Sequence, residues 1–574
     1  MRMVQVPRAV HTSRMRDDSP RNDGVLRGYR TRLMMTTRMG RMTKNPATLL
    51  AICLPLATSA VQAQTIEPRS PEAPPEVDVL ASAVNAISRM HMESFTDSTL
   101  WEAAIDGMIN ALNDPYAELF TPQEAEAWEE DTTGNYSGIG LQITLLNEEI
   151  TVTAVFRGFP ASEHGISVGD VIVGVDEHDA SDWGTDMAAD SIRGPVGTDV
   201  EVRIKRVGYE RPIPYTITRE EVHVPAVTWG VLDTNIGYVI MDRVARNAAR
   251  EMNEALLELE NADGLIIDLR RNPGGFLDES LMLADLFLAP GSTLASTVQR
   301  VPGGAADQPE TDSYGDRWPV QVPDLPIVIL VDEFTASGAE ILAGALQDYD
   351  RAVVLGERTF GKGVVQTVMP LPYGRRLRFT TGSWLTPLGR SLQRARDRQG
   401  VPIPEVVDSL PRVQTAQGRS LIDGGGVFPD LVIEDDTLTL SERDFIRESN
   451  EAQFPLGLRI AEFGFQAAAA RREADQRSSV TPEEFEGFVA SLRSEGLESN
   501  LLDDEGVRAY LRWRTELATA QRMNDIAAEA DVRTRRDPVL TEAIRLLQST
   551  TTQQELFRAV DANPAATQGP AGGF

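Results

Sequence analysis

The chain has 574 residues and carries 86 Asp and Glu against 55 Lys and Arg, which gives a formal net charge of −31. Its length allows three or four domains. Basic residues are in excess within residues 1–63, so the rest of the chain is more acidic than the total indicates. Nucleic-acid binding is therefore not expected, because phosphate contacts need basic patches.

The N-terminal part has the pattern of a secretory signal peptide. An apolar run, Ala47–Ala60, follows Arg41 and Lys44, and small residues precede a cleavage site after Ala63. A run of roughly 15 residues is short for a membrane span. We therefore predict a signal peptide over residues 42–63 and a periplasmic or otherwise extracytoplasmic location.

Residues 1–41 are expected to result from an upstream start codon chosen in place of the true one, with a disordered tail as the alternative. Cys53, the single cysteine, lies in the apolar run. Cleavage after Ala63 would remove Cys53, so the mature chain would have no thiol. This excludes a cysteine nucleophile and disulfides. A lipoprotein anchored through Cys53 is the other possibility, although Ile52 is bulkier than the residue that normally precedes a lipidated cysteine.

A linker and a helical region are expected next. Residues 64–77 are rich in Pro and Glu, which is typical of a linker. Apolar residues then recur at helical spacing from Val79 to Leu112, until Asp114-Pro115 ends the pattern. This helical region is expected to pack against a neighbouring domain or a second subunit.

Short strands with glycine-containing turns are predicted from Tyr136 to Glu220. Three segments resemble a PDZ domain in their order, and they begin at Ser137, Pro160 and Arg193. A glycine-rich loop exposes N–H groups that can bind a chain-terminal carboxylate, while the adjacent strand edge pairs with a peptide. Arg193 would reinforce the carboxylate site or relay its occupancy, or else form a surface ion pair. The predicted peptide-binding loop consists of Gly138, Ile139, Gly140 and Leu141.

A candidate nucleophile lies where a predicted strand turns into a predicted helix. Ile327–Val331 is a β-branched run typical of a buried strand, and helical spacing begins at Ser337. A serine at this point lies near unpaired backbone N–H groups and the positive end of the helix dipole. That environment suits a nucleophile whose reaction creates an oxyanion. The alternative is that Ser337 only caps the helix.

Lys362 is the candidate base for this serine. It lies between Gly361 and Gly363, and a neutral lysine amine can take a serine proton. Acting near pH 7 requires a fall of roughly 3 units from a free pKa near ~10.4, about 4 kcal/mol, which burial can supply. We therefore expect a dry pocket with no carboxylate touching the amine, and Gln366 holding the amine by a hydrogen bond. The alternative is a solvated loop cation.

These segments resemble the carboxyl-terminal processing peptidases, also called tail-specific proteases. Ala336–Glu340 matches their A-S-x-x-E, Phe360–Gln366 their F-G-K-G-x-x-x-Q, and Asp268–Gly275 their D-L-R-x-N-P-G-G. The glutamine comes one residue earlier here than in the family pattern. The resemblance implies a Ser337/Lys362 dyad in a crotonase/ClpP-like α/β core. It also implies an oxyanion hole formed by Gly275 and Gly338.

The C-terminal part shows helical periodicity without residues that suggest chemistry, so we expect a helical appendage for subunit contacts or adaptor docking. The predicted fold is therefore a mixed α+β and α/β multidomain protein. Its predicted segments are a mis-assigned start or tail (1–41), a signal peptide (42–63), a linker (64–77), an N-terminal helical region (78–133), a PDZ domain (134–222), a serine protease core (223–436) and a C-terminal helical region with a tail (437–574).

The predicted function is an exported serine endopeptidase that recognises protein C-termini, and the alternative is a catalytically inactive peptide-binding scaffold. No cofactor and no metal are predicted. All five histidines precede the core motifs, and neither G-x-S-x-G nor H-E-x-x-H is present, which disfavours a His-dependent hydrolase or a metalloenzyme. Asp348 is expected to be solvated in the last turn of its helix. The expected partners are proteins or peptides with free C-termini and a second copy of this chain.

Overall fold

The computed structural model describes residues 75–562, with gaps at 157, 207, 301–308, 316–318, 323–324, 435, 475–479 and 524. The predicted start region, the signal peptide and most of the linker lie outside the described residues. The first helix, α1 (Pro75–Met90), begins inside the last three residues of the expected linker. No helix in the described ranges is both long and apolar enough to cross a membrane.

The chain divides into two compact units at residues 105 and 106. The first unit contains α1 and most of α2 (Asp97–Ala111), and the second contains the described residues that follow. Both helices were predicted from the apolar spacing. Val84 is the buried residue of α1, whereas Val79 and Met90 are exposed.

The second unit begins with β1 (Glu118–Phe120) and α3 (Pro122–Thr133). Thr121 caps α3, Pro122 is its first residue, and Gly134 ends it in the left-handed conformation. A two-stranded ladder of β2 (Asn135–Gly138) and β9 (Glu220–His223) then encloses a small β-rich domain. The local sequence therefore sets both ends of α3 and the start of the next domain.

The β-rich domain is a sheet in the order β3-β4-β5-β7-β8, with β6 paired to β5. Its apolar core includes Val152, Val202 and Ile217. Because β3 pairs only with β4 among the described strands, its other edge is open to a further strand within the described part of the chain. The elements are β3 (Leu141–Leu146), β4 (Glu149–Val155), α4 (Pro160–Glu163), β5 (Val171–Val175), β6 (His178–Asp179), α5 (Thr185–Ile192), β7 (Asp199–Lys205) and β8 (Ile213–Thr218).

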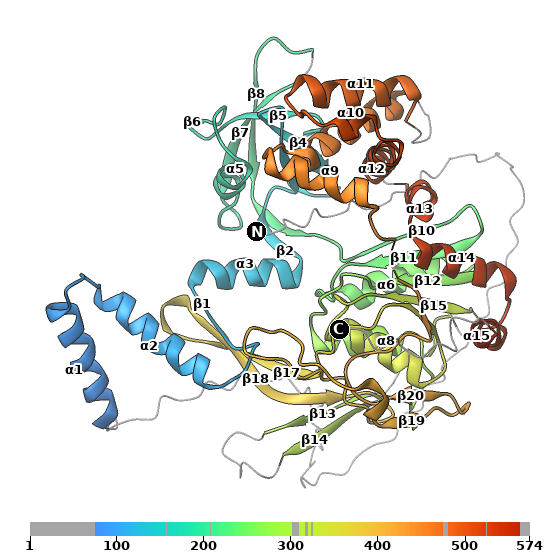
Figure 1. The fold of residues 1–574 in the computed structure, drawn as a ribbon. Coiled ribbons are helices and arrows are strands. Elements are labelled where there is room, and N and C mark those ends of the chain that lie inside the picture. The colour runs from blue at the N-terminus through green and yellow to red at the C-terminus, as the bar shows by residue number, and fades with distance from the viewer. Residues whose placement is uncertain are drawn as a thin grey trace, which may run out of the picture. The chain divides into compact units, whose positions relative to one another are not determined.

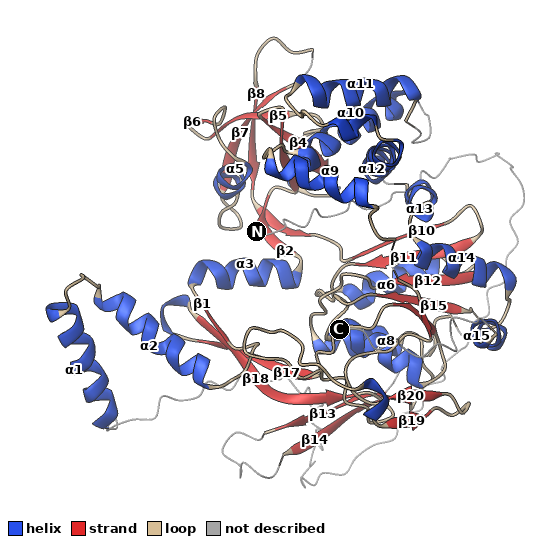
Figure 2. Ribbon diagram, in the orientation of Figure 1, coloured by secondary structure: helices blue, strands red, loops and turns tan. Residues whose placement is uncertain are grey.

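The central sheet of the larger domain has the order β10-β11-β12-β15-β16-β21. Its first four strands are labelled in Figure 2. All its pairings are parallel except that of β10 with β11. Every residue of β15 is buried, as expected for a parallel strand covered on both faces. The strands are β10 (Val227–Val231), β11 (Ile236–Met241), β12 (Gly264–Asp268), β15 (Ile327–Val331), β16 (Val353–Gly356) and β21 (Leu431–Val432).

Two apolar clusters cover the two faces of this sheet. On one face α6 (Ala248–Glu258), α7 (Leu277–Asp285) and α8 (Gly338–Asp348) bury side chains against the strands. On the other face α13 (Ile526–Thr534), α14 (Pro538–Ser549) and α15 (Gln553–Asp561) do the same (Figure 1). The last three helices are therefore part of the sheet domain.

This packing differs from the predicted appendage. The four helices before α13 share an apolar cluster of their own around Phe445, Phe488 and Leu511. Helical periodicity identifies an apolar face but does not say what covers it, so the role of α13–α15 could not be predicted from the sequence. The four helices are α9 (Leu440–Glu451), α10 (Leu456–Ala474), α11 (Pro482–Ser494) and α12 (Glu505–Met523).

A second sheet lies beside the first in the same unit. β18 pairs with β1, β13 and β17, and β14 extends the sheet from β13. β17 begins two residues after Lys362, so this sheet fixes the segment that carries the lysine. Its further strands are β13 (Thr293–Gln299), β14 (Glu310–Gly315), β17 (Val364–Pro370) and β18 (Arg376–Leu385), and a separate hairpin contains β19 (Arg412–Gln414) and β20 (Ser420–Ile422).

The expectation of a solvated Asp348 is wrong. The Asp348 carboxylate is buried and forms an ion pair of 2.6 Å with Arg390, which is buried too. It also accepts a hydrogen bond of 2.8 Å from the Leu388 N–H. The pattern could not reveal this, because Arg390 reaches α8 only when the later turn folds over it.

We predict that Leu546→Ala in α14 lowers the free energy of unfolding by about 2–5 kcal/mol, because Leu546 is fully buried in the cluster that covers the sheet. Leu440→Ala in α9 is the matched control, since Leu440 is 75% exposed and its change should stay within about 0.5 kcal/mol. Urea-induced unfolding of the two variants measures both values. Equal losses would contradict the covering role of α14.

Candidate active site

The site forms where two neighbouring parallel strands end. β12 and β15 lie side by side, so the loops that follow them meet at one edge of the sheet. Thr335 Oγ1 donates to the Leu269 carbonyl over 3.0 Å, and the Ala336 N–H donates to the Asn272 carbonyl over 2.9 Å. These bonds hold the loop before Ser337 against the loop that ends at Gly275.

The loop after β12 approaches the serine closely because it contains glycine. Gly274 has φ +88°, and a Cβ built there would lie 2.6 Å from the Gly338 nitrogen and 2.8 Å from Ser337 Cβ. A Cβ on Gly338 would lie 3.2 Å from the Gly275 nitrogen. The backbone nitrogens of Gly275 and Gly338 therefore lie together beside Ser337. Among the described residues, the structure records no acceptor for either N–H.

Asn272 holds this loop from inside. Its side chain is fully buried, and its carboxamide oxygen accepts a hydrogen bond of 2.8 Å from the Gly274 N–H. Its carboxamide nitrogen donates to the Met241 carbonyl at the end of β11 over 3.0 Å. The asparagine therefore satisfies buried main-chain groups that the turn would leave unpaired.

Ser337 has a strained backbone. Its φ of +53° and ψ of −116° lie outside the regions that L-residues favour. Such conformations cost of order 1–3 kcal/mol and persist only where the surroundings enforce them. Here the Ser337 N–H donates to the Glu340 carboxylate over 2.8 Å, and the Ser337 carbonyl accepts from Ile341 over 3.0 Å. The turn places the serine half-buried at the first turn of α8.

The Glu340 carboxylate connects the serine segment to the lysine segment. It is fully buried, and it accepts hydrogen bonds of 2.8 Å from each of the Gly361 and Lys362 N–H groups and 2.5 Å from Thr359 Oγ1. With the bond from Ser337, four donors converge on one side chain. Burial raises the pKa of Glu340, and the four hydrogen bonds act in the opposite direction.

Lys362 has the electrostatic environment that a lysine base requires. Burial, and then the positive charge of Arg378, lower the pKa of Lys362 to about 8, while Glu340 and Asp114 act against this shift. The Lys362 Nζ lies 5.2 Å from the centre of the Tyr116 ring. The lysine backbone is held on both sides, because its carbonyl accepts a bond of 3.1 Å from Trp384 Nε1.

Gln366 contacts Tyr116. The side-chain amide of Gln366 donates to the Tyr116 carbonyl over 3.0 Å. The ring of Tyr116 lies near the Lys362 amine. A bond from Gln366 to the amine itself, which the sequence analysis predicted, is not among those recorded for the described side chains. Gln366 is thus connected to Lys362 through Tyr116.

The predicted peptide-binding loop lies next to the open edge of β3. Ile139 is buried, and its carbonyl accepts a hydrogen bond of 2.8 Å from Ala161. Gly140 has φ +84°, and a Cβ there would lie 2.5 Å from Phe159 Cβ, so the turn requires glycine. Gly138 ends β2 and Leu141 begins β3.

Arg193 forms the surface ion pair that was one of its predicted roles. Its guanidinium lies 3.0 Å from the Glu130 carboxylate of α3 and 5.5 Å from the centre of the Tyr136 ring. Burial raises the pKa of Glu130, and the charge of Arg193 acts to lower it. The pair links the small β-rich domain to α3.

Comparison with known proteins identifies both domains. Residues 235–401 match the model of peptidase family S41, and residues 129–205 match that of the PDZ domain. Residues 235–401 are therefore similar to the peptidases of family S41. The relationship predicted from the motifs is confirmed, and so is the mixed multidomain fold.

Two curated relatives resemble the chain over its central part, and both are described as a "Probable CtpA-like serine protease". The one from Staphylococcus epidermidis is 32% identical over 331 residues, 57% of this chain and 65% of the relative. The one from Staphylococcus aureus is 34% identical over 319 residues, 55% of this chain and 61% of the relative. The match therefore spans less than two thirds of either relative. Among solved structures, a photosystem II D1 C-terminal processing protease shares 26% identity over 58% of this chain and 93% of that chain, with a TM-score of 0.32.

Sequence reasoning did not assign roles to Glu340, Tyr116 and Arg378. The signal for Glu340 was present, because a glutamate three residues after a serine at a helix start is the pattern of a capping box. That pattern accounts for the bond to Ser337 alone. The bonds to the lysine segment form only when segments distant in the sequence fold together, and the positions of Tyr116 and Arg378 depend on the same folding.

We predict that acylation of Ser337 by a fluorophosphonate accelerates with pH through an apparent pKa near 8, because the amine must lose its proton to act as a base. Arg378→Gln should move this inflection to higher pH, since the positive charge of Arg378 disfavours the ammonium form. Arg376→Gln, on the same strand and paired with Glu129, is the control and should leave it unchanged. A flat labelling rate from pH 6 to 9 would contradict a lysine base.

Proposed function

We propose that this chain is an exported serine endopeptidase that captures protein C-termini on its PDZ domain and cleaves peptide bonds with Ser337 and Lys362. The observation that carries the proposal is the buried Glu340 carboxylate, which binds the backbone N–H groups of both residues. One rigid group thus fixes the serine segment relative to the lysine segment. The lowered pKa of Lys362 supports the same assignment.

The reaction follows from these positions. The neutral Lys362 amine takes the Ser337 hydroxyl proton as the oxygen attacks the substrate carbonyl carbon. The oxyanion that forms accepts hydrogen bonds from the Gly275 and Gly338 N–H groups. The lysine ammonium then gives its proton to the leaving amine, and water hydrolyses the acyl-enzyme with the amine as base again. The Tyr116 ring near Nζ stabilises the transient positive charge.

An inactive binding scaffold is the alternative function. The strain at Ser337 and the buried amine of Lys362 both favour a peptidase, because each reduces the stability of the fold and neither would help a binding module. The glycine loop and the free edge of β3 would serve either function.

Export and self-association are further parts of the proposal. Export is supported by the apolar run Ala47–Ala60 and its flanking residues in the sequence. Self-association is supported by the exposed apolar side chains of α1 and α2, such as Val79 and Met108. Of the C-terminal helices, α9–α12 would be the ones available for it, since α13–α15 are buried against the sheet of their own chain.

We predict that Ser337→Ala and Lys362→Ala each lower the rate of proteolysis by about three orders of magnitude or more, and that the double variant is little worse. Lys362→Arg should fail too, because a guanidinium cannot lose its proton in this pH range. Cleavage of an unfolded protein measures the rates, and thermal unfolding checks that each variant is folded. Near-normal turnover in Lys362→Ala would refute the lysine base.

We further predict that a free C-terminus on the substrate raises kcat/KM. Amidating it should lower kcat/KM by about 5- to 150-fold, the cost of roughly 1–3 kcal/mol for donors left without their carboxylate. Binding of the same peptides to the Ser337→Ala chain should weaken in parallel, because capture and chemistry lie on different domains. Equal cleavage of free and amidated peptides would leave a peptidase without C-terminal recognition. Tight binding with no cleavage by the unaltered chain would favour the scaffold.

A further inference from the structure

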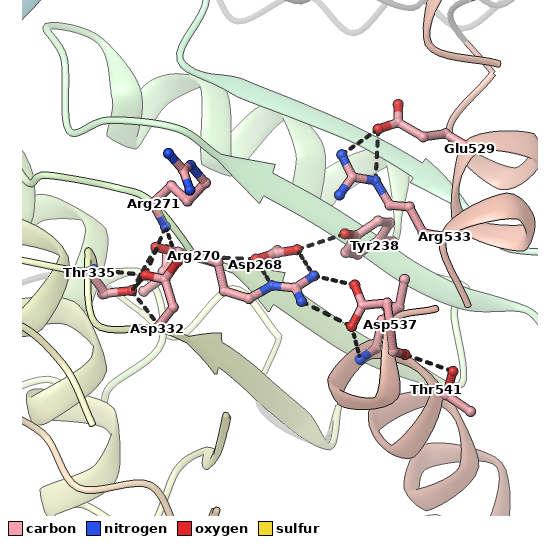
Figure 3. Close-up of polar contacts among 12 residues, drawn as sticks. Tyr238, Asp268, Arg270, Arg271, Asp332, Thr335, Glu529, Arg533, Asp537 and Thr541 are labelled. Atoms are coloured by element: carbon pink, nitrogen blue, oxygen red, sulfur yellow. Dashed lines mark hydrogen bonds and ion pairs between the residues drawn. The ribbon is translucent and has the colours of Figure 1, made fainter. Parts of the chain in front are cut away.

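An ion-pair cluster joins the C-terminal helix α14 to the strand that precedes the glycine loop (Figure 3). Arg270 lies two residues beyond the end of β12, and its guanidinium contacts the Asp268 carboxylate over 2.8 and 2.9 Å. The same guanidinium contacts the carboxylate of Asp537, the residue that caps α14, over 2.8 and 3.0 Å. One arginine is therefore held by two carboxylates that are 269 positions apart in the chain.

The cluster is nearly closed to water. The side chains of Asp268, Arg270 and Asp537 are 6%, 12% and 11% exposed. Tyr238 donates its hydroxyl to Asp268 over 2.7 Å from the other side. If one of these side chains moved away, another buried charge would lose its partner, which is energetically costly. The three side chains therefore hold one another in place.

The main chain on both sides of Arg270 is bonded to the serine segment. The preceding residue, Leu269, accepts the bond from Thr335. The following residue, Arg271, donates its N–H to the Asp332 carboxylate over 2.9 Å. One residue further, Asn272 accepts the bond from Ala336. A shift at Arg270 would therefore move the contacts that set Gly275 beside Gly338 and Ser337.

Helix α14 can act as a fixed anchor for this arginine. Leu540 and Leu546 of the helix are fully buried against the second face of the central sheet. Asp537 stands at its first turn, where its carboxylate also accepts a bond of 2.8 Å from the Leu540 N–H. The carboxylate is thus fixed by the packing of the helix.

We propose that Asp537 is a positioning residue of the S41 peptidase: through Arg270 it holds the Leu269–Gly275 loop where the Gly275 N–H meets the oxyanion. This inference rests on the proposed function. It assigns a role in the reaction to a residue well beyond the matched region 235–401. The loss of this residue should affect the transition state more than substrate binding, since the carboxyl oxygen gains its charge only as the reaction proceeds.

The test is Asp537→Asn in the full chain, because asparagine can still cap the helix but carries no charge for Arg270. We expect kcat to fall by about tenfold or more, KM to stay within about twofold, and the apparent pKa of the pH profile to stay unchanged. Glu542→Gln is the control. It breaks an ion pair of 2.6 Å with Arg545 on the same helix, where Arg545 is 56% exposed, and should change neither constant.

A second measurement separates positioning from general loss of structure. A peptide boronic acid forms a tetrahedral, negatively charged adduct with a serine and so needs the oxyanion donors, whereas the uncleaved peptide does not. Asp537→Asn should weaken boronate binding by at least about tenfold and leave binding of the free-carboxylate peptide unchanged. Asp537→Glu, which keeps the charge, should recover part of kcat, and it serves as the test variant if Asp537→Asn does not fold.

The remaining outcomes overturn one proposal or the other. Unchanged kcat and boronate affinity in Asp537→Asn, with an active unaltered chain, would refute the positioning role alone. If Asp537→Asn lost peptide binding, boronate binding and thermal stability in parallel, Asp537 would have only a structural role. If Asp537→Asn does not fold, the Asp537→Glu chain decides the question. An Asp537→Glu chain with the kcat and boronate affinity of the unaltered protein would support the role. An Asp537→Glu chain that folds but loses boronate binding and peptide binding equally would refute it. An unaltered chain that cleaves no unfolded protein would refute the proposed function itself.

Discussion

The buried Glu340 carboxylate is the interaction on which the candidate site depends. It accepts hydrogen bonds from four donors, which come from the serine turn and from the segment that carries the lysine. Without it, the N–H groups of Ser337, Gly361 and Lys362 would be left without this acceptor in a region that excludes water, at about 1–3 kcal/mol each. The carboxylate therefore both fixes the relative position of the two segments and makes the strained turn at Ser337 tolerable.

A carboxylate so close to Lys362 would be expected to favour the ammonium form, yet the pKa of Lys362 falls to about 8. The geometry explains why the opposite effect wins. The recorded bonds of Glu340 go to backbone N–H groups and to the Thr359 hydroxyl, and its charge acts on the Lys362 pKa more weakly than burial and the Arg378 charge do. Burial of the amine and the nearby Arg378 charge then decide the direction of the shift. The sequence-based expectation of a dry amine with no carboxylate in contact stays a prediction.

Local patterns predicted the parts of the site that depend on local structure. The β-branched run before Ser337 and the apolar spacing after it predicted the strand, the turn and the helix, and all three are present. Two glycines end the D-L-R-x-N-P-G-G motif, and the close contacts at Gly274 explain why glycine is required there. The contacts between distant segments could not be predicted in this way. The helical pattern predicts a solvated Asp348, but in the folded chain Arg390 covers it and pairs with it. Gln366 bonds to Tyr116, which lies 250 positions earlier in the sequence.

The C-terminal helices show why the domain built on the central sheet is larger than the region that matches the S41 model. The described residues between 235 and 401 supply β11, β12, β15 and β16, but none of their helices covers the second face of the sheet. Tyr238, Ile266, Leu330 and Leu355 on that face are buried by α13–α15. Burying one such side chain contributes about 1.5–3 kcal/mol, so leaving these four in water would cost about 6–12 kcal/mol, comparable with the 5–15 kcal/mol net stability of a typical domain. The helices that complete the fold also bring Asp537 to Arg270, so stability of the sheet and the position of the glycine loop depend on the same segment.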